Sequence, residues 1–203
     1  MSRNSNILLL ASLLALALSA CNKSETPKTE TAGDELVIRI GAAAPLTGPQ
    51  AHIGKDNENG TRMAIEDANA RGVTIGGRKT RFELLSEDDQ TDPKTATIVA
   101  QKLVDAKVNG VIGHLNSGTT IPASRIYNDN GIAQISPSAT AVKYTAQGYN
   151  NAFRVMSNDA QQGRVLGEFA AKNLKAKTIA VIDDRTAYGQ GIADEFIKAA
   201  EAS

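Results

Sequence analysis

Residues that could bind a small molecule gather in four segments of this sequence, each of which follows an expected strand. The segments are rich in hydroxyl groups and glycine, three of the four carry little charge, and they span 45–54, 114–120, 136–145 and 183–189. The second segment places Ser117 and backbone amides at the start of an expected helix, where partial positive charge favours an anion such as a carboxylate. Ordinary helix capping by Ser117 or Thr119 would explain the same residues equally well.

A second cluster of hydroxyl and carbonyl groups stands at Ser138, Ala139 and Thr140. Such groups suit an ammonium group, which donates hydrogen bonds, and a second carboxylate oxygen, which accepts them. Taken alone, these three residues would be no more than a turn.

Motifs of enzymes, cofactors and metal sites are absent from the sequence. There is no Gly-x-Ser-x-Gly elbow or Walker loop, and the Gly-Gln-Gly run at 189–191 has Asp194 where a dinucleotide fingerprint needs a third glycine. The acidic residues of 87–92 lack calcium-loop spacing. His52 and His114 stand far apart without a cysteine partner. We therefore expect no catalytic residue, no cofactor and no metal.

The N-terminus has the features of an export signal. Arg3 precedes an apolar core at 7–18, which is shorter than the roughly 20 residues of a spanning helix. Leu18-Ser19-Ala20-Cys21 resembles a bacterial lipobox, which implies cleavage after residue 20, acylation of Cys21 and attachment to a membrane. The alternative is that Cys21 merely ends an ordinary signal. Cys21 is the only cysteine, so no disulfide can form within the chain.

Residues 21–35 are almost entirely polar and predict a flexible tether. Acidic and basic residues number 22 each, and removal of Arg3 with the signal would leave a net charge near −1. Such a balance argues against nucleic-acid binding.

The remaining pattern alternates strands and helices. Apolar runs and turn signals predict strands at 36–44, 80–86, 110–113, 132–135, 152–156 and 178–182, and helices at 55–71, 92–104, 117–130, 159–173 and 190–202. Such alternation favours an α/β fold with a doubly wound parallel sheet and right-handed crossovers. We expect a nearly complete first lobe at 36–153 and the truncated beginning of a second lobe at 154–203.

An ordered set of short motifs resembles the leucine/isoleucine/valine-binding proteins of ABC transporters. The motifs are Ala44-Pro45-Leu46-Thr47-Gly48-Pro49, Asp88-Asp89 with Asp92-Pro93, Val111-Ile112-Gly113-His114, Ser136-Pro137-Ser138-Ala139-Thr140 and Tyr188-Gly189. The resemblance implies a two-lobed type I periplasmic binding fold that closes on its ligand by a hinge.

The same resemblance assigns roles to the candidate residues. Ser117 would bind the ligand carboxylate, Thr140 would contact the carboxylate and the ammonium group, and the carbonyl of Ser138 would bind the ammonium group. The side-chain pocket would be bordered by Ala139, Leu115, Asn116, Ile53 and, from the second lobe, Tyr188.

Three departures from the family affect these expectations. Ile53 replaces an aromatic residue that relatives often place in the first loop, and Thr91 and Asn116 replace a cysteine pair found in some relatives. The acidic partner of the ammonium group is expected beyond residue 203. The preferred ligand side chain is therefore left open.

The resemblance implies capture of a branched-chain or similar small amino acid, without chemical reaction, for a permease in the cytoplasmic membrane. The protein would then be periplasmic or on the cell surface, lipid-anchored and, when complete, monomeric. A ligand-sensing receptor domain for an amide or other small polar ligand, an inactive fragment, and a hydrolase or dehydrogenase on the same kind of sheet are the alternatives.

We expect residues 22–203 alone to bind amino acids poorly, because half of the site and part of the core would be missing. Calorimetric titration of that fragment checks this expectation. A soluble, monomeric fragment with micromolar affinity would contradict it.

Overall fold

The computed structural model describes residues 35–203. The predicted signal (1–20), Cys21 and nearly all of the predicted tether (21–35) lie outside the described residues. In the described part, no helix is both long enough and apolar enough to cross a membrane.

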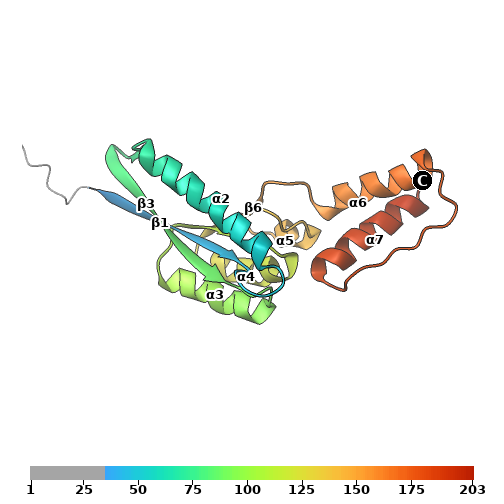
Figure 1. Ribbon diagram of the computed structural model, residues 1–203, viewed down its shortest axis with the longest axis horizontal. Helices are drawn as coiled ribbons and strands as arrows, with labels where there is room; N and C mark the ends of the chain where they lie inside the picture. Colours follow the sequence, from blue (N-terminus) through green and yellow to red (C-terminus); the bar gives the residue numbers. More distant parts are fainter. Residues whose placement is uncertain (1–34) are drawn as a thin grey trace, which may run out of the picture. The chain divides into compact units, whose positions relative to one another are not determined.

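The centre of the fold is a parallel sheet, as the alternating pattern predicts (Figure 1). Its middle strand, β1 (Leu36–Ala44), pairs in parallel with β3 (Arg78–Asp88) on one side and β4 (Gly110–Gly113) on the other. β5 (Ala133–Ser136) and β6 (Ala152–Arg154) continue the parallel sheet beyond β4. The carboxyl ends of these strands therefore meet at one edge of the sheet.

Helices cover both faces of this sheet (Figure 1). α2 (Ala51–Ala70) contacts β1 and β3 on one face, and α3 (Pro93–Asp105) packs with α4 (Ser117–Asp129) on the other. α3 begins as predicted: the side chain of Asp92 accepts a hydrogen bond of 2.7 Å from the backbone amide of Thr95, and a proline occupies the first turn. The observed sheet and helices confirm the predicted α/β fold.

The main core lies between the sheet and the pair α3 and α4. Apolar side chains of β1, β4, α3, α4 and the segments just before β4 and β5 form it: Ala43, Val99, Ala100, Leu103, Val108, Val111, Ala123, Tyr127 and Ile132. Leu103 is completely buried, and a Cβ on Gly41 would lie only 3.0 Å from it. Small residues in β1 thus let α3 approach the sheet closely.

Two short elements differ from the sequence prediction. β2 (Thr74–Ile75) pairs antiparallel with β3 through a turn in which both Gly76 and Gly77 have positive φ. α5 (Val142–Ala146) lies within a stretch expected to be loop. α2 also begins at Ala51 rather than at residue 55, so the first loop ends at Gln50.

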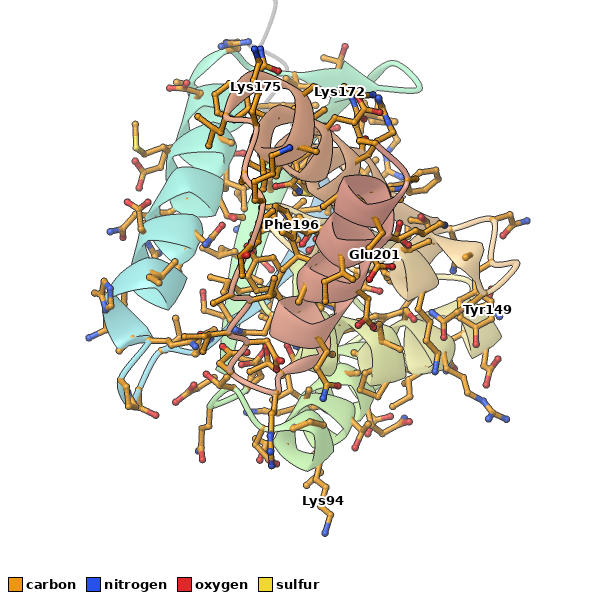
Figure 2. The ribbon with its side chains drawn as sticks, turned by 90° about the vertical axis from the view of Figure 1, so that its right-hand side faces the viewer. Lys94, Tyr149, Lys172, Lys175, Phe196 and Glu201 are labelled. Atoms are coloured by element: carbon orange, nitrogen blue, oxygen red, sulfur yellow. The ribbon has the colours of Figure 1, made fainter. Side chains whose placement is uncertain are left out.

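The C-terminal part contains α6 (Asp159–Glu168), a turn of π-helix η1 (Phe169–Asn173) and α7 (Ala187–Glu201). α6 and α7 pack side by side. Figure 2 shows Lys172 and Lys175 at the η1 end and Phe196 and Glu201 along α7.

One prediction for this part is wrong. Residues 178–182 form no strand, because within 35–203 no other strand lies beside them to supply hydrogen bonds. α6 packs through glycine rather than through Leu166, which is 52% exposed. Gly163 and Gly167 face α7, where added Cβ atoms would lie 2.6 Å from α7 atoms.

We predict that Leu103→Ala lowers the free energy of unfolding by about 2–5 kcal/mol, because it leaves a cavity in the core. Ile98→Ala on the same helix is the matched control, since Ile98 is 69% exposed, and it should cost less than about 1 kcal/mol. Urea denaturation of both variants measures the difference. Equal losses would contradict this placement of the core.

Candidate functional site

Three of the four candidate segments lie next to one another at the carboxyl edge of the sheet. They follow β1, β4 and β5, which are neighbours in the sheet order. The fourth segment, 183–189, leads into α7. A Cβ on Gly118 would lie 4.0 Å from Ala187, so the start of α7 lies beside the start of α4.

The segment after β4 turns directly into α4. Asn116 precedes the helix and Ser117 is its first residue. The carbonyl of Asn116 accepts hydrogen bonds from the amides and hydroxyls of Thr119 and Thr120. No side chain caps α4, so the alternative explanation, in which Ser117 or Thr119 is an ordinary helix cap, is wrong. The partial positive charge of the helix N-terminus remains at the start of α4.

Ser117 joins α4 to the segment after β5. Its side chain is 2% exposed, and its Oγ accepts a hydrogen bond of 3.2 Å from the backbone amide of Ala141. The hydroxyl of Ser138 donates to the carbonyl of Leu115 over 2.6 Å. These contacts hold the loop of Leu115 and Ser117 against the loop of Ser138, and together the two loops form one wall at the edge of the sheet.

Arg154 supports the same wall from β6. Its guanidinium donates to the carbonyls of Ala139 and Ala141, over 2.8 Å in both cases. Ala139 is almost completely buried, at 1% exposed. Because the cation binds two carbonyls on either side of Thr140, the position of the Thr140 backbone is fixed.

Asp159 is an acidic group at this site that sequence reasoning missed. Its amide donates to the carbonyl of Thr140 over 2.9 Å, and a Cβ on Gly191 of α7 would lie 3.2 Å from its Oδ2. Both carboxylate oxygens of Asp159 and the Oγ1 of Thr140 are buried without a hydrogen-bond partner among the described residues. A buried carboxylate without a hydrogen-bond donor therefore lies beside Thr140.

Burial raises the pKa of Asp159, and the adjacent hydroxyl of Thr140 and the charge of Arg154 act in the opposite direction. The sequence hid this residue because Asn158-Asp159 at the start of a helix has the form of a cap. Asn158 does cap α6, since its side chain accepts from the amide of Gln161 over 3.1 Å. The side chain of Asp159 therefore takes no part in this cap.

The other predicted residues lie at the margin of this wall. The side-chain amide of Asn116 donates to Oε1 of Gln50 over 2.8 Å, one turn before Ile53, which is 44% exposed. Tyr188 is 47% exposed in the first turn of α7. Leu115 lines a cavity of about 10 Å³ beneath α2, enough for one water molecule. Tyr188 lines a groove between α7 and the segment 179–184.

The acidic residues of 87–92 have separate structural partners. Glu87 pairs with Lys102 at 2.8 Å, and Asp89 binds the ring of His114. Asp88 accepts hydrogen bonds from Leu46 and Thr47, as well as from Gln90. Burial opposes ionisation of Asp88, but these hydrogen bonds together hold its pKa below the usual value, so its carboxylate fixes the first loop.

Comparisons with known proteins identify a family and a fold for this chain. A family model described as periplasmic binding protein matches residues 37–203. Leu/Ile/Val-binding protein homolog 1 of Brucella abortus (strain 2308) is 46% identical over 161 residues, which make up 79% of this chain and 43% of that protein. The leucine-, isoleucine-, valine-, threonine-, and alanine-binding protein of Pseudomonas aeruginosa is 44% identical, over 81% of this chain and 43% of its own length.

Among solved structures, a leucine binding protein LivK of Thermotoga maritima matches with a TM-score of 0.73 and 26% identity. The match covers 81% of this chain and 46% of that one. The chain thus spans less than half the length of these relatives.

We predict that Asp159→Asn stabilises the ligand-free protein at pH 7, by about 0.5–2 kcal/mol. A carboxyl group whose pKa is higher in the folded protein destabilises the fold as the pH rises from the unfolded pKa of about 3.9 toward the folded value. The gain from the neutral amide should therefore vanish below about pH 4.

Thermal unfolding at pH 3.5 and pH 7 measures this gain. Asp194→Asn, an exposed change on α7, serves as the control and should shift the midpoint little at either pH. A variant at Asp159 that is less stable at pH 7 would show that the carboxylate has a stabilising partner.

Proposed function

Because this chain belongs to the periplasmic binding protein family and has its type I fold, we propose that it captures a small amino acid outside the cytoplasm for an ABC permease. One observation carries the proposal. A helix N-terminus with hydroxyl groups, suited to a carboxylate, lies on the same wall as a buried acid without a hydrogen-bond donor, suited to an ammonium group. An α-amino acid carries both groups.

The carboxylate end of the site is the start of α4. The backbone amide and hydroxyl of Ser117 would bind one carboxylate oxygen, and the hydroxyl of Thr140 would bind the other. Partial positive charge at the helix start favours the anion by about 0.3–1 kcal/mol in exposed sites and more when water is excluded. The existing bond from Ala141 to Ser117 keeps the serine hydroxyl available as a donor, because it uses the oxygen as an acceptor.

The ammonium end consists of oxygen acceptors. The carbonyl of Ser138, the hydroxyl of Thr140 and the carboxylate of Asp159 would accept its three N–H groups. An ammonium ion would supply Asp159 with the charge and the donors that it lacks without ligand. A carboxylic acid without an amino group would leave this cost in place, so we expect it to bind weakly.

The ligand side chain would meet an apolar margin. Leu115, Asn116, Ala139 and Ile53 would border it from the first lobe, and Tyr188 would cover it from the second. This composition suits a branched-chain or similar small side chain, as the names of the relatives suggest. The relatives are named for binding amino acids, so we propose that this protein likewise binds its ligand without a chemical reaction.

Ligand entry requires movement, because Asp159 and Thr140 are almost completely covered by protein. We infer that residues 36–153 form the first lobe, that 154–203 begin the second, and that α6 and α7 swing from the wall about residues 154–158. Cleavage after residue 20 and acylation of Cys21 would hold the protein at a membrane in the periplasm or on the cell surface.

A thermal-shift screen of the complete gene product, including any residues encoded after Ser203, tests the proposed function. The screen should contain the 20 common amino acids and, as a comparison, 4-methylpentanoate, which is leucine without its amino group. A ligand at 100 times its dissociation constant adds about 2.7 kcal/mol of stability. No shift with any amino acid would refute the ligand class, and an equal shift with 4-methylpentanoate would refute the role of Asp159.

We predict that Ser117→Ala weakens amino-acid binding by about tenfold or more, because a hydrogen bond to a charged group is worth about 1.5–3 kcal/mol. Ser124→Ala is the matched control, since Ser124 is equally buried on the same helix but bonds to Ile121 and Gln147. Calorimetric titration should show unchanged affinity for the control. Equal affinities of the two variants would remove Ser117 from the site.

A further inference from the structure

The ring of His114 is buried between the end of β3 and α4, and both of its nitrogens have partners. Nδ1 lies 2.7 Å from Oδ2 of Asp89, and Nε2 lies 3.2 Å from the hydroxyl of Tyr127. All three side chains are 0% exposed. The other oxygen of Asp89 accepts from the amide of Thr91 over 3.0 Å, which fixes the carboxylate in turn.

The partners of the ring indicate where its hydrogen bonds run. A carboxylate accepts hydrogen bonds, so the contact with Asp89 calls for a proton on Nδ1 of His114. Burial raises the pKa of Tyr127, so its hydroxyl keeps its proton and can donate to Nε2. The two contacts thus fix the orientation of the His114 ring from both sides.

The backbone of His114 connects this network to the proposed binding wall. Its carbonyl accepts from the hydroxyl of Ser136 over 2.8 Å and from the hydroxyl of Thr120 over 3.0 Å. The Ser136 oxygen also accepts from the amide of Ala139 over 2.9 Å. Rotation of the His114 carbonyl group would therefore break hydrogen bonds that hold both the loop 115–117 and the loop 138–140.

Resting on the proposed function, we propose that Asp89, His114 and Tyr127 are positioning residues, which hold the two ligand-binding loops in their binding geometry. The three side chains stand apart from the proposed ligand-binding groups, because their hydrogen bonds run to one another and to the amide of Thr91. They act through the carbonyl of His114, which Ser136 and Thr120 both bind. Loops fixed before the ligand arrives lose less conformational entropy on binding, so the network increases affinity without touching the ligand.

Tyr127→Phe tests the proposal with little change in shape, because it removes one hydroxyl and keeps the ring. Tyr144→Phe is the matched control: Tyr144 is also 0% exposed, and its hydroxyl donates to the carbonyls of Gln134 and Phe153, outside the network. Both variants of the complete gene product should lose thermal stability. Only Tyr127→Phe should weaken L-leucine binding, by about tenfold, in calorimetric titration well below the unfolding temperature.

Two measurements judge the network without any ligand. Nitrogen NMR of His114 should show a protonated Nδ1 and an unprotonated Nε2 in the wild type, with the Nε2 signal shifted in Tyr127→Phe. Hydrogen exchange of the Ala139 amide should be faster in Tyr127→Phe than in Tyr144→Phe. Because these readouts need no ligand, failure of the wild type to bind L-leucine would count against the proposed function alone.

Asp89→Asn provides a second variant if Tyr127→Phe does not fold. The amide has one oxygen for two donors, so either His114 or Thr91 loses its acceptor, and binding should weaken similarly. Unchanged affinity of a folded network variant, or a His114 ring protonated on Nε2 alone, would overturn the proposal.

Discussion

Parallel pairing of β1 with β3 on one side and β4 on the other determines where the candidate binding groups lie. The register places Ala43 beside Gly113 and Ala44 beside Asp88, so the neighbouring strands end at the same edge of the sheet. Gly113 is essential to this closeness, because its φ of 134° suits glycine and an added Cβ would overlap the carbonyl of Ala43. Loops that are far apart in the sequence thereby become neighbours.

Polarity differs across the wall that these loops build. The start of α4 offers amide donors, whereas Asp159 and nearby carbonyl groups offer acceptors. The buried carboxylate of Asp159 has no hydrogen-bond donor in the described residues, which costs stability in the ligand-free protein. Under the proposed function, an ammonium group of the ligand would relieve this cost, and the relief would add to affinity. The free energy gained by packing the core around Leu103 offsets this cost.

The sequence predicted those parts of the fold that depend on local signals. β1 has the predicted bounds, and Asp92 caps α3 as its spacing with Pro93 suggests. The two-residue strand β2 was missed because its signal, Gly76-Gly77, marks a hairpin turn whose strands are too short to show a pattern. Residues 178–182 have a strand pattern, but a strand exists only where another chain segment pairs with it.

The site was partly predictable for a similar reason. Hydroxyl groups after strands pointed to Ser117 and Ser138, and the structure brings both to one wall. Asp159 could not be found, because only tertiary packing distinguishes a buried acid from a helix cap. Likewise, His114 carried no signal for its role, since Asp89 and Tyr127 approach it only in the folded protein.

Backbone NMR of the complete gene product during titration with L-leucine tests whether the ligand binds at the wall of Ser117, Thr140 and Asp159. We predict that the amide signals of these three residues shift most, because the ligand would form hydrogen bonds there. Shifts confined to the groove between α7 and the segment 179–184, or saturating binding that leaves the amides of Ser117 and Thr140 unchanged, would contradict this prediction.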